Sequence, residues 1–226
     1  MIDTALRIVL YALIAGASPL ALLSTLAILG SRRGRVNGSV FGAGFLLGQS
    51  AAFLAAHFVG SALTTDGEGG FETLAGSVEV ALGVLLLAFA WRARRLPEPG
   101  EHTGESRTKA LLARLGRLRP ATAFSIGALL GVGGVKRLTI TVLAGTTIAT
   151  PGLASVEEVG LGVLYVLIAS LLVWLPVGVY LVVGRRADYW MASAEQWLAA
   201  NERRLTFLLT LVFGLLLAGD GLIRLL

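Results

Sequence analysis

The sequence predicts an all-α integral membrane protein of six transmembrane helices, arranged as two three-helix halves that form a 3+3 inverted repeat. Three observations lead to this prediction: long apolar runs, basic residues confined to alternate connections, and an interruption in both the first and the fourth run. Of the 226 residues, 55% are hydrophobic and 15% are charged, and the mean hydropathy is +0.79. A soluble domain has about 25% charged residues, so lipid is the expected solvent for these runs.

Six apolar segments are close to, or longer than, the roughly 20 residues that a helix needs to cross a bilayer. Few ionisable residues interrupt them, namely His57, Glu72, Glu79, Lys136, Arg137 and Asp220. The segments are residues 8–30, 36–63, 71–91, 121–148, 159–184 and 205–223.

Lysine and arginine are concentrated in the first, third and fifth connections between these segments. The second and fourth connections have neither, and carry Asp66, Glu68, Glu157 and Glu158 instead. Because cytoplasmic loops are enriched in Lys and Arg, we expect a multi-pass plasma-membrane protein with both termini outside. The net charge of +5 then reflects orientation and contact with anionic lipid, and no nucleic-acid partner is expected. The basic residues are Arg32, Arg33 and Arg35; Arg92, Arg94, Arg95, Arg107, Lys109, Arg114, Arg117 and Arg119; and Arg185, Arg186, Arg203 and Arg204.

The third connection separates the two halves. Residues 97–106 are polar and rich in Pro and Gly, which predicts a flexible linker. Residues 107–119 place leucines on one helical face and basic residues opposite, which is typical of a helix on the inner membrane surface; a partly helical soluble linker is the alternative. Residues 187–200 have a similar spacing, and either lie at the headgroup level or pack against the bundle. The predicted units are the first repeat at 1–91, the basic linker at 92–120 and the second repeat at 121–226.

The first and fourth segments are interrupted by residues that weaken a helix. Pro19, after Ser18, lacks a backbone N–H and clashes with the preceding turn, and Gly133 and Gly134 each cost a helix about 1 kcal/mol. In inverted-repeat transporters, interrupted helices at corresponding positions mark a midplane binding site. We therefore predict that these four residues contribute to a substrate site. A kink without a binding role is the alternative.

Other glycines and one proline in the segments have simpler expected roles. Gly44 and Gly48, like Gly127 and Gly131, are small residues at four-residue spacing, which we expect to allow close helix packing. Pro176 predicts a kink in the fifth segment.

Four ionisable residues inside the segments are candidates for function, because charges are expensive in lipid. Lys136 and Arg137 follow the glycines of the fourth segment and are predicted to bind an anionic head group at a helix N-terminus. Glu79 and Asp220 are predicted to be counter-ions or proton sites. At 1.5 Å per residue, Lys136, Glu79 and Asp220 lie roughly 20–24 Å above the inner face of the membrane. The alternative is that the two cations and the two carboxylates form structural ion pairs.

No pattern in the sequence indicates catalysis. The chain has two histidines, His57 and His102, and no cysteine, and it shows neither a metal-ligand spacing nor a phosphate-binding glycine loop. His57 is expected to be structural or interfacial, since it stands alone on an apolar face. We therefore expect a protein that is not an enzyme, with no metal site and no cofactor.

Four stretches, taken in order, resemble the GAP-like, sulfolipid-addressing protein family of the LysE-type exporter superfamily. They are GASPLALLSTLAILGSRRGRVNGSVFGAGFLLG, GVKRLTITVLAGTTIA, VLIASLLVWLPVGVYLVVG and the terminal GDGL. The resemblance implies a six-helix inverted fold in the plasma membrane and a role in delivering lipids or glycolipids to the cell surface. Where the family commonly has Asn-Pro-Lys, this chain has Gly134-Val135-Lys136, so the lysine carries over but the helix-breaking Asn-Pro pair does not.

The sequence therefore predicts a transporter that exports or flips an anionic lipid or glycolipid toward the cell surface. Two alternatives remain: an accessory subunit of a larger lipid exporter, and an exporter of a small molecule such as an amino acid or an ion. The expected partners are the anionic lipid or glycolipid, the membrane, and either a second copy of the chain or larger lipid-export machinery.

Overall fold

The computed structural model describes residues 2–31, 33–64, 80, 84, 87, 119–149 and 154–225, and within these residues every regular element is helical. The predicted third span, the linker at 97–106 and the surface helix at 107–119 lie outside the described residues except for single positions. The elements are α1 (Ile2–Gly16), α2 (Pro19–Leu29), α3 (Gly34–Thr64), α6 (Pro120–Val132), α7 (Val135–Ile148), α8 (Ser155–Ala169), α9 (Leu171–Val183), the short 3-10 helix η1 (Gly184–Ala187) and α10 (Asp188–Leu225).

The predicted spans correspond to one straight helix and three bent pairs of helices. In the described part of the chain, α3 alone is long and apolar enough to cross a membrane as a single helix, and up to four spans result if each bent pair is one span. The bends are 59° between α1 and α2, 62° between α6 and α7, and 72° between α8 and α9. The predicted sixth span appears as a shorter apolar stretch, Phe207–Gly219, within α10.

Each bend has a local cause. α2 begins with Pro19 at its first position, and the Ser18 side chain caps it by accepting a hydrogen bond from the Ala21 N–H at 3.4 Å. Between α6 and α7, Gly133 has a φ of +85°, which only glycine adopts without strain. The interruptions predicted in the first and fourth segments are therefore present, and glycine replaces the Asn-Pro pair.

The fifth segment breaks at a place that the sequence analysis did not predict. We expected a kink at Pro176, but Pro176 lies inside α9, and the chain bends at Ser170, between α8 and α9. The break leaves the Leu167 carbonyl without its usual helical donor, and the Trp174 indole N–H donates to that carbonyl at 2.8 Å. An indole next to the break thus satisfies a backbone group that lipid could not satisfy.

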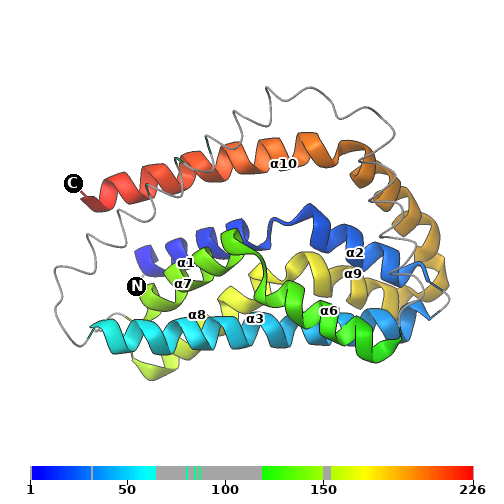
Figure 1. The fold of residues 1–226 in the computed structure, drawn as a ribbon, viewed down its shortest axis with the longest axis horizontal. Coiled ribbons are helices and arrows are strands. Elements are labelled where there is room, and N and C mark those ends of the chain that lie inside the picture. Colours follow the sequence, from blue (N-terminus) through cyan, green and yellow to red (C-terminus); the bar gives the residue numbers. More distant parts are fainter. Residues whose placement is uncertain are drawn as a thin grey trace.

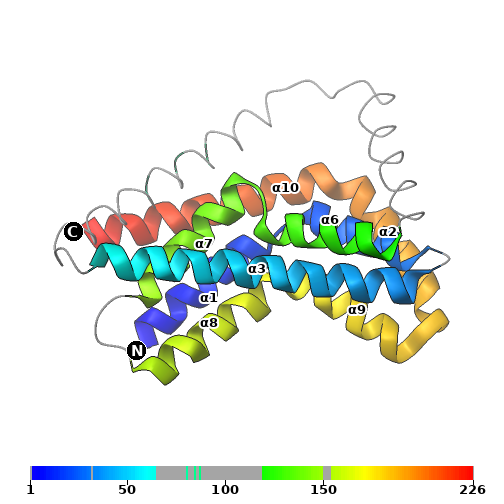
Figure 2. The same cartoon turned by 60° about the horizontal axis from the view of Figure 1, so that its bottom comes forward.

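The three bent pairs lie side by side, with their breaks near the middle of the long axis. α1, α7 and α8 occupy one half of the molecule and α2, α6 and α9 occupy the other, while α3 runs through both halves (Figures 1 and 2). Each half has its own apolar core, and a third apolar cluster packs α2 and α9 against η1 and α10. The first core is built from Ile8, Tyr11, Ala12, Ile14, Ala15, Phe53, Ile140, Leu143, Ala144, Ile148, Tyr165, Ala169 and Leu217; the second is built from Ala21, Ile28, Phe41, Phe45, Ala123 and Val173.

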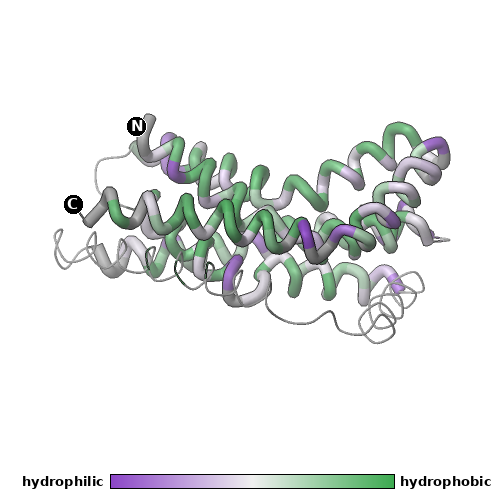
Figure 3. The backbone as a smooth tube through the Cα atoms, turned by 90° about the horizontal axis from the view of Figure 1, so that it is seen from above, coloured by the Kyte–Doolittle hydropathy of each residue, from purple (hydrophilic) through white to green (hydrophobic). Residues whose placement is uncertain are grey.

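Arginines gather at one end of the molecule, while Glu157, Glu158 and one further arginine, Arg7, lie toward the other. α3 and α6 begin at the end where η1 lies, which carries Arg33, Arg35, Arg119 and Arg186. Arg35 also ties this end together, since its guanidinium donates to the Leu181 carbonyl of α9 at 3.0 Å. The opposite end holds the start of α1, the end of α10 and the start of α8 (Figure 1). Hydrophobic residues fill most of the length between the ends (Figure 3).

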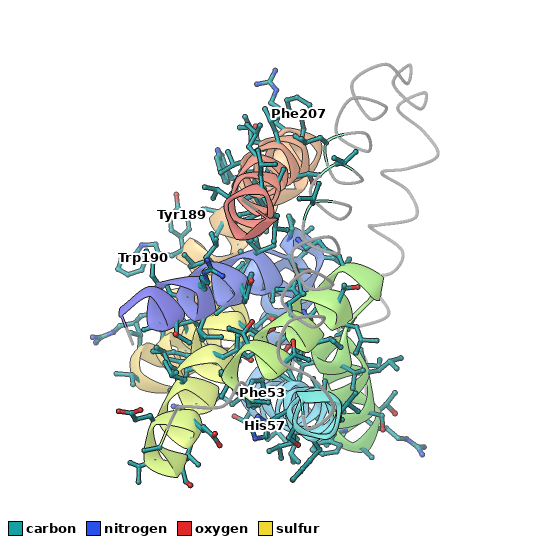
Figure 4. All side chains as sticks on the ribbon, turned by 90° about the vertical axis from the view of Figure 1, so that its left-hand side faces the viewer. Phe53, His57, Tyr189, Trp190 and Phe207 are labelled. Atoms are coloured by element: carbon teal, nitrogen blue, oxygen red, sulfur yellow. The ribbon has the colours of Figure 1, made fainter. Side chains whose placement is uncertain are left out.

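α10 differs from the sequence prediction. We expected residues 187–200 either to lie at the headgroup level or to pack against the bundle, followed by a separate span at 205–223. A single bent helix covers Asp188–Leu225 instead. Its first part buries Met191 and Leu198 and exposes three large aromatic side chains, so it both packs against the bundle and presents aromatic residues outward (Figure 4). The exposed aromatics are Tyr189, Trp190 and Trp197.

α3 and α6 approach so closely that their backbones touch. A Cβ added at Gly44 or Gly48 of α3 would collide with the Phe124 or Ala128 carbonyl of α6, and one added at Gly127 of α6 would collide with the Phe41 carbonyl. Small residues at four-residue spacing allow this kind of approach in membrane helices. The packing role that we predicted for these glycines is therefore confirmed.

We predict that Gly48→Ala lowers the free energy of unfolding by about 1–3 kcal/mol, because the added methyl group overpacks the α3–α6 contact. The matched control is Gly160→Ala in α8, where a Cβ meets nothing within 4 Å and alanine improves helix propensity. Thermal unfolding in detergent should show a lower midpoint for the first variant and an equal or higher midpoint for the second. Equal midpoints for both variants would contradict the close contact.

Candidate functional site

The three helix breaks meet at Lys136 and Arg137, in the first turn of α7. The Lys136 Nζ donates to the Ala17 carbonyl, at the break between α1 and α2, over 3.1 Å. The Arg137 guanidinium donates to the Ala169 carbonyl, at the break between α8 and α9, over 3.3 Å. The ends of α1 and α8 also touch, since a Cβ at Gly16 would lie 3.1 Å from the Ile168 carbonyl oxygen. Two adjacent cations thus bind carbonyl groups that two other helices expose where they break.

Arg137 is buried, with 6% of its surface exposed. Besides Ala169, its Nη1 donates to the Gln49 Oε1 of α3 at 2.9 Å, and its guanidinium lies 4.8 Å from the centre of the Phe45 ring. Gly133 makes room for this side chain, because a Cβ there would collide with the Arg137 Cδ. The glycine that breaks the helix therefore also accommodates the aliphatic part of the arginine.

A chain of neutral hydrogen bonds extends this cluster. Gln49 donates from Nε2 to the Thr141 Oγ1 at 3.2 Å, and Thr141 donates to the Arg137 carbonyl at 2.8 Å. The Tyr165 hydroxyl lies 2.9 Å from the same Thr141 oxygen. One hydroxyl has one hydrogen and two acceptor sites, so Thr141 uses its full capacity if Tyr165 is the donor in the last bond.

The polar cluster separates the two apolar cores. Phe41, Phe45, Gln49 and Phe53 recur every four residues along one face of α3. Phe41 and Phe45 belong to one core and Phe53 to the other, so Gln49 lies at the boundary. The cluster is therefore a thin polar layer in the middle of an apolar molecule, where electrostatic interactions are strong.

The charge of this layer is not balanced by the residues whose side chains the structure describes. Among them, no carboxylate lies within ion-pair distance of Lys136 or Arg137, and Glu158 instead lies near His57. The start of α7 adds a partial positive charge of its own, and its N-cap residue, Gly134, supplies no side-chain cap. The Ser170 Oγ, at the third break, is buried and has no hydrogen-bond partner in the described part of the chain. The layer is thus electropositive, which suits an anion.

The predicted site residues take different positions around this layer. Ser18 and Pro19 start α2, Gly133 ends α6, Gly134 caps α7, and Lys136 and Arg137 follow in the first turn of α7. Glu79 and the side chain of Asp220 lie outside the described residues.

Sequence reasoning missed Gln49, Thr141 and Tyr165, which hold Arg137 in place. A signal for Gln49 was available, because it is the one amide within a phenylalanine stripe of period four. It also missed the neighbour of His57, whose Nε2 lies 3.9 Å from the Glu158 Oε2 of α8; the structural or interfacial role expected for His57 stays a prediction.

The layer offers hydrogen-bond donors rather than metal ligands. Among the described residues, no group of three or more His, Cys, Asp or Glu is placed to hold a metal ion. Lys136 has three N–H donors, of which one is used on Ala17, and its ammonium lies 6.0 Å from the centre of the Phe213 ring of α10. Lys136, which is only partly buried, therefore keeps two donors for an anionic group, whereas Arg137 is buried and its Nη1 is engaged by Gln49 and Ala169.

The sequence matches the model of a known protein family. Residues 8–223 match the model of a family described as Sap, sulfolipid-1-addressing protein, so the chain belongs to that family. No curated protein and no solved structure matches the chain.

We predict that Arg137→Met destabilises the protein more than Lys136→Met. The arginine variant leaves the Gln49 and Ala169 oxygens without a buried donor, at a cost of about 1–3 kcal/mol. Both variants remove an uncompensated charge, but the lysine variant loses one hydrogen bond, to Ala17, whereas the arginine variant loses two, so the loss for Lys136→Met should be smaller. Thermal unfolding of the two purified variants in the same detergent measures the difference, and a larger loss for Lys136→Met would show that the roles assigned to the two cations are reversed.

Proposed function

We propose that this member of the sulfolipid-1-addressing protein family transports an anionic lipid or glycolipid across the membrane toward the cell surface, without changing it chemically. One observation carries the proposal: two adjacent cations lie at the start of α7, among three helix breaks, with no carboxylate beside them in the described residues. The apolar helices and the family's sulfolipid-related name support a lipid in a membrane.

The energetic argument starts from the cost of charge in lipid. A lone cation in the bilayer centre is expensive, and a helix N-terminus is an unfavourable place for it. An anionic head group at this position reverses both effects, because it pairs with the ammonium and accepts hydrogen bonds from the first backbone N–H groups of α7. The layer is therefore stabilised by a negatively charged ligand.

The two cations have different roles in this proposal. Arg137 holds the breaks together through Gln49 and Ala169 and positions the first turn of α7. Lys136 binds the head group, exchanging the Ala17 carbonyl for the anionic oxygen. We also retain Glu79 and Asp220 as proposed counter-ion or proton sites, on the basis of their positions in the third and sixth predicted spans.

The transport proposal includes the six-span, 3+3 inverted arrangement of the LysE-type exporters. The similar bends of the α1–α2 and α6–α7 pairs, 59° and 62°, support a repeat that begins each half with a broken helix. The arginines at the η1 end support a cytoplasmic location for that end and an outside location for both termini.

We predict that Lys136→Met lowers transport of a sulfated glycolipid by roughly tenfold or more, because a hydrogen bond to a charged group contributes about 1.5–3 kcal/mol. The assay uses proteoliposomes with a fluorescent sulfatide, and quenching from outside reports the fraction transported. Lys136→Arg should retain part of the activity, since it keeps the charge. Arg186→Met, which removes an exposed cation far from the layer, should transport as well as the unaltered protein.

Unchanged transport by Lys136→Met would exclude Lys136 as the head-group site. Absence of transport by the pure protein, together with its co-purification with a large membrane pump, would favour the accessory-subunit alternative instead.

A further inference from the structure

A groove of about 460 Å³ runs between α3 and α8, within the range of roughly 300–1,000 Å³ that is typical of ligand sites. Its lining is mostly apolar, and the two ionisable residues that line it, His57 and Glu158, come from facing helices. The lining residues are Leu46, Ser50, Phe53, Leu54, His57, Glu158, Val159, Gly162, Val163, Val166 and Leu167.

The groove has the length of one leaflet. Along α3 it extends from Leu46 to His57, which is roughly 16 Å at 1.5 Å per residue. The hydrocarbon core of a bilayer is about 30 Å thick, so the groove covers about half of it. Its inner end lies near the middle of the molecule, since Leu46 and Leu167 are close in sequence to Gln49 and Ala169 of the polar layer.

The groove opens on the surface that faces lipid. Leu54, Val159 and Val163, which line it, are 51%, 66% and 54% exposed. Phe53 forms its inner wall, and its ring packs at 5.4 Å from the Tyr165 ring of the polar layer. An acyl chain of a neighbouring lipid can therefore enter sideways, and Phe53 separates it from Arg137.

The outer end of the groove is polar. His57 and Glu158 retain 22% and 30% of their side-chain exposure, and His57 projects from α3 beside Phe53 (Figure 4). The His57 Nε2 faces Glu158, whereas its Nδ1 is buried and has no hydrogen-bond partner in the described residues. The buried Nδ1 needs a hydrogen-bond partner. The Glu158 carboxylate, on the Nε2 side of the ring, is a strong hydrogen-bond acceptor.

We propose that the α3–α8 groove binds one acyl chain of a glycolipid, with the sugar hydroxyls at His57 and Glu158. Hydroxyl groups suit this end because they donate to the carboxylate and to the imidazole nitrogen. A phosphate suits it poorly, because two negative charges repel each other at the edge of a low-dielectric region. The inference rests on the proposed function for the membrane setting, but it concerns a second site, distinct from Lys136.

The test is photolabelling of the full-length protein in liposomes, followed by mass-spectrometric mapping of the labelled residues. The probes are a glycosyl diacylglycerol and a phosphatidic acid that carry the same photoreactive acyl chain. We expect the glycosyl probe to label the groove segments of α3 and α8 more strongly than the phosphatidic acid. Val163→Trp should fill the groove and abolish this labelling, while Val182→Trp on α9, where the valine is 86% exposed and outside the groove, should leave it intact.

The variant Glu158→Gln is expected to increase labelling of the groove by one probe, which a loss of folding could not do. It keeps an acceptor and removes the charge, so phosphatidic acid labelling of the groove should rise toward that of the glycosyl probe. Labelling spread evenly over the lipid-facing helices, insensitivity to Val163→Trp, or equal labelling by both probes in the unaltered protein would each overturn the inference. Lys136→Met should abolish transport and leave groove labelling in place, so the failure of one site is distinguishable from that of the other.

Discussion

The structure depends on satisfying backbone groups that are exposed where helices break inside an apolar environment. Three bent pairs break at one level, and lipid offers no hydrogen bonds to the carbonyls left open there. Lys136, Arg137 and the Trp174 indole supply the donors, to Ala17, Ala169 and Leu167 respectively. The breaks are thus mutually dependent: the cations need the carbonyls because they are buried, and the carbonyls need the cations because their helices have ended.

This dependence explains which features were predictable from sequence. Gly133-Gly134 and Pro19 act on their own backbone, so both breaks were visible locally. The break at Ser170 carries no such signal, and Pro176 pointed to the wrong position because its lost hydrogen bond is tolerated inside α9. Gln49 and Arg137 are 88 residues apart, and their contact follows from how α3 crosses α7, which no local pattern encodes.

The cluster also shows that two adjacent cations in an apolar segment can have different surroundings. Lys136 and Arg137 look equivalent in the sequence, yet neighbouring positions on a helix point about 100° apart. Arg137 turns toward α3 and α8 and is enclosed, while Lys136 turns toward α1 and α10 and keeps unused donors. A cation enclosed by hydrogen bonds and a cation with unused donors therefore occur side by side, and the enclosed one positions the other.

The glycine contact between α3 and α6 has a mechanical consequence. Where backbone touches backbone there are no rotamers to rearrange, so the contact either holds or separates completely. The two helices consequently behave as a single rigid strut along half of the molecule. The α6–α7 break at Gly133-Gly134 then lies next to a fixed support, so a turn of the start of α7 at this break would leave α3 and the rest of α6 in place.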